Sequence, residues 1–304
     1  MACAGGSHGW PEGRAGAMAD PAAPDALETP SGKGSRDENF PVGSWLLPAR
    51  LRPHVAAYYA IARTTDDIAD NPGLAPAEKL RRLDVFAAAV AGESAGGPVP
   101  ASAARMRDSL AATGLGPRHV LDIIAAFRQD ATRRRYASWD DLMGYCNLSA
   151  APVGRYVLDL HGEDRATWAV SDPLCNALQV LNHLQDCRDD YRALDRVYLP
   201  EPWLAAAGTG VEALAAERSG PALRAVIDRM LDGVDALMAR ARLLPGAVKS
   251  RRLAMETAII VRLADRLAAL LRDGDPLARR VALSRRDFAR AGLSGAIGGL
   301  LLRR

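Results

Sequence analysis

The stretch RTTDDIAD (residues 63–70) decides how this chain is interpreted, because NHLQDCRDDY (residues 182–191) repeats its acidic pattern further along. Asp66 and Asp70 are four residues apart, and so are Asp186 and Asp190. Residues four apart in an α-helix lie on the same face. Each stretch therefore predicts a helix that presents two carboxylates side by side.

Paired carboxylates on one helix face need a cation or water to neutralise them. Like charges at this spacing destabilise an isolated helix by roughly 0.2–0.5 kcal/mol per pair. Magnesium is suited to this role because it binds through one or two carboxylates, keeps several waters and bridges to substrate phosphates. Two such faces predict two or three Mg²⁺ ions around one diphosphate. The diphosphate then becomes a good leaving group, because its developing negative charge is already compensated.

The alternative reading of each acidic pair is a solvated helix end, and a single DxxxD favours that alternative. Here the pattern occurs twice, and an apolar stretch precedes each pair, at Val55–Ile61 and Leu174–Leu184. Each pair is therefore expected at the edge of a buried wall. A carbocation needs an apolar cavity that excludes stray water. We interpret the two pairs as one site that closes such a cavity.

The spacing of apolar residues predicts an all-α fold, a single helical bundle around a central apolar cavity. Apolar residues recur every three or four positions from about residue 39 to 271, and the alternation typical of strands is scarce. Pro152 and Gly154 are expected to kink one long helix. The expected helices are Arg52–Asp70, Pro76–Ala91, Ala101–Thr113, Pro117–Arg134, Trp139–Leu160, Asp172–Tyr191, Ala222–Leu243 and Arg252–Leu271.

Composition divides the chain into three parts. Residues 1–35 are rich in Gly, Ala, Pro and Ser and predict a disordered tail. Residues 36–290 form the predicted helical domain, and residues 291–304 a flexible C-terminal tail. No stretch resembles a signal peptide or a membrane span, so a cytoplasmic location is expected. Peripheral contact of the mildly apolar C-terminal stretch with the inner membrane, and transient contact with an upstream synthase, are left open.

Charge and motif content exclude several function classes. The net charge of +3 is spread along the chain without a dense basic run, so no nucleic-acid partner is expected. The four cysteines lack CxxC spacing, and a reducing compartment fits them. No histidine pair has zinc-site spacing. There is neither a GxGxxG after a predicted strand nor a P-loop, so no nicotinamide cofactor is expected.

At its motifs the sequence resembles the squalene and phytoene synthase family, which has the class I isoprenoid-synthase fold. YAIARTTDDIAD (residues 59–70) is similar to the first family motif. The resemblance implies that Tyr59 and Arg63 line a diphosphate site, and that Asp66 and Asp70 bind magnesium. Asp66 would thereby act directly in catalysis.

Two further motifs follow in the family's order. YCNLSAAPVG (residues 145–154) resembles the central family helix, which implies that Tyr145 lies near the reacting carbons. LQVLNHLQDCRDDYRALDRVYLP (residues 178–200) resembles the second signature. It implies metal binding by Asp186 and Asp190, with Asp186 also catalytic. The implied substrate-binding residues of this signature are Gln179, Asn182, Arg196 and Tyr198.

Some of these side chains also have structural interpretations. Tyr145 alone would be a core tyrosine with a paired hydroxyl. Arg63 and Arg196 can be salt-bridge partners of nearby aspartates. Gln179 and Asn182 share a helix face with Asp186 and need polar partners if they are buried.

Within the family, ENFPVGSWLLPARLRPHVAAYYAIAR (residues 38–63) resembles most the branch that acts in bacterial hopanoid biosynthesis. That branch ionises presqualene diphosphate and captures the cation with water, which gives hydroxysqualene and diphosphate. One alternative is condensation of two farnesyl diphosphates to presqualene diphosphate or squalene. Another is a catalytically silent scaffold, which the two intact aspartate pairs disfavour.

The chain departs from the family pattern at three places. Glu38-Asn39-Phe40-Pro41 stands where many members have a Ser-rich segment, and Cys175 where a glycine is usual. Gln185 replaces the usual arginine before the second-motif aspartate. We interpret this as the loss of one basic phosphate contact, which agrees with an enzyme that handles a single diphosphate.

Overall fold

The structure is a computed structural model that describes residues 47–93 and 98–301, with side chains to residue 293. All regular elements within these residues are helices, so the predicted all-α class is confirmed. The predicted tail at residues 1–35 and the segment Glu38–Pro41 lie outside the described residues. No helix in the described part of the chain is long and apolar enough to cross a membrane.

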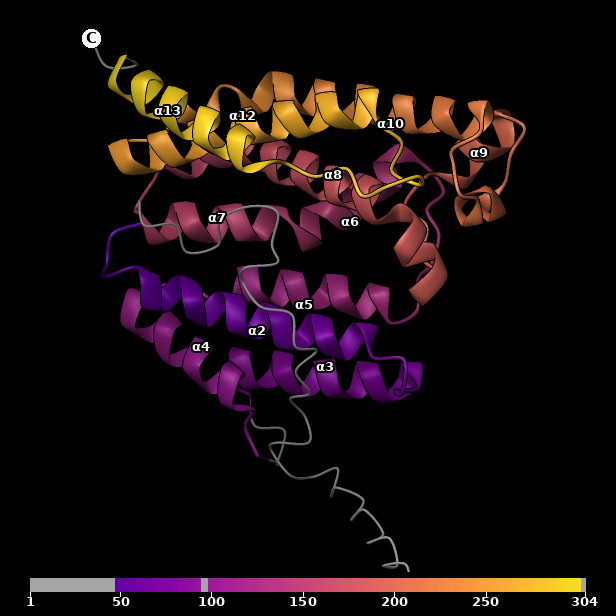
Figure 1. Cartoon of the computed structure of the whole chain (residues 1–304). Helices are drawn as coiled ribbons and strands as arrows, with labels where there is room; N and C mark the ends of the chain where they lie inside the picture. Colours follow the sequence, from indigo (N-terminus) through magenta and orange to yellow (C-terminus); the bar gives the residue numbers. More distant parts are fainter. Residues whose placement is uncertain (1–46, 94–97, 302–304) are drawn as a thin grey trace, which may run out of the picture.

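The helices pack in layers that Figure 1 shows from the side. Four N-terminal helices form one layer, namely α2 (Arg52–Asp70), α3 (Pro76–Ala91), α4 (Ala101–Thr113) and α5 (Arg118–Asp130). Next to them lie α6 (Trp139–Ser149) and α7 (Ala151–Leu160). Beyond these lie α8 (Trp168–Leu194), α10 (Pro221–Ala241), α12 (Arg251–Asp273) and α13 (Arg285–Leu301). Short elements connect them: η1 (Arg165–Thr167), α9 (Glu201–Ala206), η2 (Val211–Ala215) and α11 (Leu244–Ala247).

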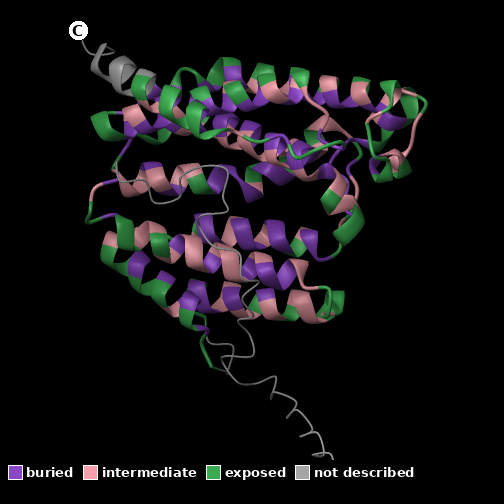
Figure 2. Cartoon of the chain, viewed as in Figure 1, coloured by how far each residue is buried: buried purple, intermediate pink, exposed green. Residues whose placement is uncertain are grey.

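Two buried apolar clusters hold the layers together. One joins the inner faces of α2 to α5 and includes Ile61, Phe86 and Ile124. The other joins α6, α8, α10 and α12, with Leu181 and Met230 among its members. Their three- and four-residue spacing places apolar side chains inward, as the distribution of buried residues in Figure 2 shows. The candidate site lies between elements of both clusters.

Most predicted helices appear near their predicted bounds, but the predicted helix Trp139–Leu160 is two helices. The helix is interrupted at Ala150, whose φ of −116° and ψ of −48° separate α6 from α7. Pro152 lies in the first turn of α7, where its missing N–H costs no helical hydrogen bond. The prediction of a single kinked helix was therefore wrong. Helix α13 runs through residue 290, the boundary predicted for the C-terminal tail.

Helices α7 and α8 approach closely at Gly154. A Cβ atom built at this position would lie 2.5 Å from Cys175 Sγ and 2.7 Å from Ser171 Oγ. The thiol of Cys175, the residue that replaces a family glycine, therefore occupies space that Gly154 leaves open. A side chain at residue 154 would push the two helices apart.

We predict that Gly154→Ala lowers the melting temperature by roughly 3–10 °C, because overpacking a core contact costs about 1–3 kcal/mol. The measurement is thermal denaturation followed by circular dichroism. Cys175→Ala in the same chain should restore part of the loss, since it removes the nearer clashing atom. A Gly154→Ala protein as stable as the wild type would contradict the close helix contact.

Candidate functional site

A polar pocket of about 310 Å³ lies between α2, α5, α6, α8 and the segment that follows α8. It is lined by every site residue that the sequence predicts, except Asn182 and Asp186. Those lining residues are Tyr59, Arg63, Asp66, Asp70, Tyr145, Gln179, Asp190, Arg196 and Tyr198. The pocket therefore unites residues of all three sequence motifs.

A tight turn after α8 directs Arg196 and Tyr198 into the pocket. Asp195 ends the helix with a φ of 52°, a left-handed conformation in which aspartate is more common than most residues. The Arg135 guanidinium donates to Asp195 Oδ1 at 2.6 Å. The Val197 amide donates to the carbonyl of Arg134 at 2.9 Å. These contacts attach the turn to the loop between α5 and α6.

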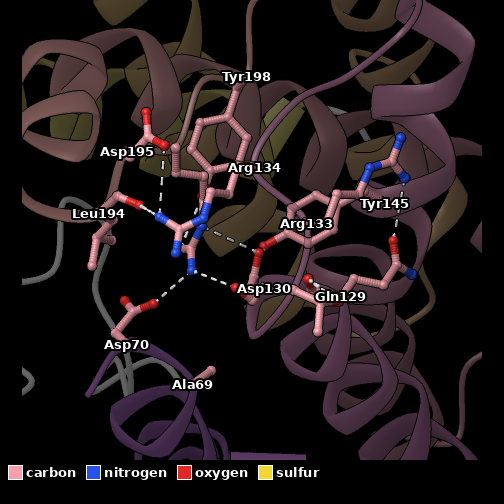
Figure 3. A network of polar contacts seen from close by, with 12 residues as sticks. Ala69, Asp70, Gln129, Asp130, Arg133, Arg134, Tyr145, Leu194, Asp195 and Tyr198 are labelled. Atoms are coloured by element: carbon pink, nitrogen blue, oxygen red, sulfur yellow. Dashed lines mark hydrogen bonds and ion pairs between the residues drawn. The ribbon is translucent and has the colours of Figure 1, made fainter. Parts of the chain in front are cut away.

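Arg196 is buried and makes several of the pocket's polar contacts. Figure 3 shows its partners Asp70 and Asp130 together with Tyr145 and Tyr198. Its Nη2 donates to Asp70 Oδ1 at 2.9 Å and to the carbonyl of Asp130 at 3.1 Å. Its Nε lies 3.7 Å from Asp130 Oδ1. Burial lowers the pKa of Arg196, but the charges of Asp130 and Asp70 raise it overall. One guanidinium therefore joins the end of α2 to the end of α5.

Burial and neighbouring carboxylates raise the pKa values of Asp66 and Asp190. Burial and the charge of Asp70 raise the pKa of Asp66 to about 8, although Arg63 opposes this with an ion pair of 3.1 Å. Burial, Asp186 and Asp70 raise the pKa of Asp190 to about 7. Because Asp66, Asp70 and Asp190 line one pocket and the charge of Asp70 on α2 acts on Asp190 on α8, these three carboxylates face each other across the pocket.

Asp186 and Asn182 do not line the pocket. Asp186 lies on the same face of α8 as Asp190, close enough to raise that residue's pKa. Its Oδ1 forms an ion pair of 3.5 Å with Arg280, from the segment between α12 and α13. The structure thus places Asp186 beside the acidic cluster, toward the C-terminal segment.

Gln185 does not face the polar pocket. Its side chain is buried, and its Nε2 donates to the carbonyl of Val281 at 2.6 Å. The neighbouring Arg188 donates to the carbonyl of Leu277 at 2.5 Å. The side chain at position 185 binds the segment before α13 and lies outside the polar pocket. The interpretation of Gln185 as a lost phosphate contact was therefore wrong.

A second, apolar pocket of about 230 Å³ lies beside earlier turns of α2 and α8, the two helices that carry the aspartate pairs. Val55 of α2 and Leu174 and Leu178 of α8 line it. Tyr59 and Gln179, which lie closer to the acidic pairs along the two helices, line the polar pocket instead. Both helices therefore pass from an apolar pocket to an acidic one. This is the apolar wall that the sequence predicts upstream of each aspartate pair.

Asp130 and Ser149 line the polar pocket but were missed in the sequence. The Tyr145 hydroxyl donates to Asp130 Oδ2 at 2.8 Å, a contact visible in Figure 3. Burial raises the pKa of Asp130 to about 6, although Arg196 and the Tyr145 hydrogen bond lower it. A signal was present, because Asp130 follows Ile123 and Phe127 at helical spacing and so lies on the buried face of α5.

His183 supports the pocket from behind. Its ring stacks on Tyr198, with ring centroids 3.4 Å apart and planes 11° apart. Burial, with a contribution from Arg196, lowers the pKa of His183 to about 3, so the imidazole is neutral at pH 7. The stack fixes the ring of Tyr198, whose hydroxyl accepts from Arg196 Nη1 at 3.4 Å.

The residues of the pocket fit magnesium only in combination with a phosphate ligand. Among residues 47–93 and 98–301, no three His, Cys, Asp or Glu side chains are arranged to hold a metal ion by themselves. Magnesium commonly takes one or two protein carboxylates and completes its shell with water and substrate phosphates. The facing pairs on α2 and α8 offer carboxylates of this kind.

The raised carboxylate pKa values predict a pH-dependent stability of the metal-free protein. A carboxyl group whose pKa is raised on folding binds its proton more tightly in the folded state. The free energy of unfolding therefore falls as the pH rises from about 4, the ordinary pKa, to about 8, the value of Asp66. Asp66→Asn should remove part of this slope.

The measurement is the melting temperature of wild-type and Asp66→Asn protein between pH 5 and pH 8.5 in a chelating buffer. We expect the variant to melt a few degrees higher at the alkaline end, at about 2–4 °C per kcal/mol for a domain of this size. Asp189→Asn is the matched control, because Asp189 is exposed and does not line the pocket. Equal pH slopes for all three proteins would contradict the described electrostatics.

Comparisons with known proteins agree on one family. The sequence profile of the family described as squalene/phytoene synthase matches residues 34–287. The chain is 44% identical over 279 residues to the hydroxysqualene synthase of Rhodopseudomonas palustris, covering 92% of this chain and 94% of that protein. It is 43% identical to the hydroxysqualene synthase of Sinorhizobium fredii, over 82% of this chain and 84% of the relative.

Solved structures agree with the sequence comparison. The crystal structure of squalene synthase HpnC from Alicyclobacillus acidocaldarius is 31% identical with a TM-score of 0.67, covering 82% of this chain and 92% of that one. A dehydrosqualene synthase in complex with a ligand, at 18% identity and a TM-score of 0.70, shares the fold. The similarity covers 86% of this chain and 92% of the dehydrosqualene synthase.

Proposed function

Since the chain belongs to the squalene/phytoene synthase family, we propose that it is a hydroxysqualene synthase. In the proposed reaction, presqualene diphosphate and water give hydroxysqualene and diphosphate. The family's enzymes process prenyl diphosphates, and the relatives named hydroxysqualene synthase are 42–44% identical to this chain. The reaction would supply a step of squalene and hopanoid biosynthesis.

One observation carries the proposal: a polar, acidic pocket and an apolar pocket follow each other along α2 and α8. A prenyl diphosphate has the same division, with a charged head and a long hydrocarbon tail. The polar pocket fits the head and the apolar pocket fits part of the tail. A site of this form favours heterolysis of the C–O bond, because charge is compensated on one side and water is excluded on the other.

We propose that Asp66 and Asp70 on α2, with Asp186 and Asp190 on α8, hold two or three Mg²⁺ ions together with the diphosphate. Magnesium, when bound, compensates the charge that develops on the leaving diphosphate. The raised pKa values of Asp66 and Asp190 support this role, because carboxylates crowded in this way are stabilised by a cation. Asp186 would have to exchange its ion pair with Arg280 for the metal.

The remaining pocket residues would bind and orient the substrate. Arg63 and Arg196 are the guanidinium groups of the pocket, and each is within reach of the acidic cluster. We propose that they donate to diphosphate oxygens, as arginine does in phosphate sites. Tyr59, Gln179 and Tyr198 line the same wall, where their polar atoms can bind the head group. No nicotinamide is required, because hydration of a cation involves no hydride transfer.

The direct test is incubation of the purified protein with presqualene diphosphate and Mg²⁺ in the absence of NADPH, followed by extraction and mass analysis. We expect hydroxysqualene and an equal amount of diphosphate, and no turnover after chelation of Mg²⁺. Asp66→Asn and Asp190→Asn should lower turnover at least 100-fold, in the range expected when charge stabilisation at a leaving group is removed.

Asp189→Asn is again the matched control and should keep nearly full activity. Formation of squalene that requires NADPH, or of presqualene diphosphate from farnesyl diphosphate alone, would replace the proposed reaction by a condensing one. Full activity of Asp66→Asn would overturn the metal role of the acidic pairs.

We also propose that α13 contacts the surface of the inner membrane from the cytoplasmic side. The helix packs against α12, and it exposes Phe288 and Leu293, with exposed fractions of 39% and 70%. Arg285 and Arg286 are exposed at the start of the same helix. Exposed apolar side chains beside arginines fit an anionic lipid surface. Such contact would let a water-insoluble product pass directly into lipid.

We predict that the protein sediments with vesicles that contain anionic phosphatidylglycerol, and less with vesicles of phosphatidylcholine alone. Phe288→Ser with Leu293→Ser should reduce the bound fraction severalfold, because the apolar contact is lost. Val99→Ser, which alters an exposed apolar residue before α4, is the control. Equal sedimentation of the double variant and wild type would remove α13 as the contact.

A further inference from the structure

Hydration of a carbocation needs one water molecule held beside the cation and one group that takes its proton. The requirement rests on the proposed function, and it is demanding because other water must stay out of the cavity. The acidic pairs on α2 and α8 are proposed to bind metal ions, and Arg63 and Arg196 are cations. Among the described residues lining the polar pocket, Asp130 is the carboxylate outside both pairs.

Ser149 has the features of a water ligand. It lines the polar pocket, only 8% of its surface is exposed, and its Oγ makes no hydrogen bond to any residue that the structure describes. A buried hydroxyl left in this state costs about 1–3 kcal/mol. Serine and threonine in helices commonly satisfy the hydroxyl by donating to the carbonyl four residues earlier.

Other hydroxyls of the chain do make that local bond. Thr65 donates to the carbonyl of Ile61 at 2.8 Å, and Thr257 to that of Leu253 at 2.9 Å. Ser149, the last residue of α6, differs from them because its hydroxyl makes no such bond. Its buried hydroxyl therefore lacks a partner among the described residues, which an ordered water would supply.

Tyr145 lies one helical turn before Ser149 and lines the same pocket. Its hydroxyl donates to Asp130 Oδ2 at 2.8 Å, which leaves the oxygen lone pairs to accept a hydrogen bond. Asp130 Oδ1 makes no hydrogen bond within the described residues, and the ion pair with Arg196 at 3.7 Å favours the ionised carboxylate. Tyr145 and Asp130 are thus joined by a hydrogen bond, and Ser149 lines the same pocket.

We propose that Ser149 and Tyr145 hold the water that captures the cation, and that Asp130 receives its proton through the Tyr145 hydroxyl. A lone pair of the water oxygen forms the new C–O bond while one water O–H bond breaks. That proton passes to the Tyr145 oxygen, and the Tyr145 proton passes to Asp130. The products are the neutral alcohol and protonated Asp130, without any change of oxidation state.

The test separates ionisation from capture by measuring two products of presqualene diphosphate with Mg²⁺. Diphosphate release reports ionisation, and the fraction of hydroxysqualene among the C30 products reports capture. In Ser149→Ala we expect diphosphate release within about threefold of wild type. The alcohol fraction should fall roughly tenfold or more, with hydrocarbons formed by proton loss in its place. Ser149→Thr keeps a hydroxyl and should keep most of the alcohol.

Matched variants distinguish a capture role from loss of structure. Ser109→Ala removes another buried serine hydroxyl, one bonded to His54 away from the pocket, and should leave the product ratio unchanged. Tyr145→Phe and Asp130→Asn should shift the ratio as Ser149→Ala does. Tyr136→Phe should not, because Tyr136 is a buried tyrosine that does not line the polar pocket. Circular dichroism checks that each variant is folded.

An alcohol fraction in Ser149→Ala equal to that of wild type would overturn the proposal. So would a parallel fall of diphosphate release and alcohol, because it would place Ser149 in ionisation rather than capture. A wild-type protein that releases no hydroxysqualene at all would instead overturn the proposed function.

Discussion

Four carboxylates line one pocket, and the buried guanidinium of Arg196 is the cation that links carboxylates from different helices. Asp66 and Asp70 come from α2, Asp130 from α5 and Asp190 from α8. Arg196 contacts Asp70 and Asp130 directly and also lowers the pKa of Asp190. Without a cation at this point the ends of the three helices would repel one another. The geometry of the pocket depends on this side chain, and so on the turn at Asp195 that directs it inward.

Arg196 does not neutralise the pocket. Four carboxylates face two guanidinium groups, and burial together with the neighbouring carboxylates raises the pKa values of Asp66 and Asp190. The protein therefore keeps an acidic cluster that divalent cations can stabilise, next along α2 and α8 to an apolar pocket. Such a cluster is unfavourable for folding and useful for catalysis, as strained or charged sites commonly are.

Much of this could be predicted from the sequence. The helical period and the two DxxxD pairs predicted the bundle and the facing carboxylates, because both depend on spacing within single helices. Long-range partners could not be derived in this way. Arg196 donates to Asp70, which lies 126 positions earlier in the chain. Gln185 donates to the carbonyl of Val281 and does not face a phosphate site. Ser149 was missed because it is distinguished by a buried hydroxyl without a hydrogen bond, and a sequence does not show which hydroxyls lack a partner.

The most direct test of the central claim is anomalous diffraction from crystals grown with Mn²⁺ and pyrophosphate. The account predicts metal peaks between α2 and α8, about 2 Å from carboxylate oxygens of both aspartate pairs and bridged by the pyrophosphate. Peaks confined to one helix, or a pyrophosphate bound without metal away from Asp66 and Asp190, would contradict it.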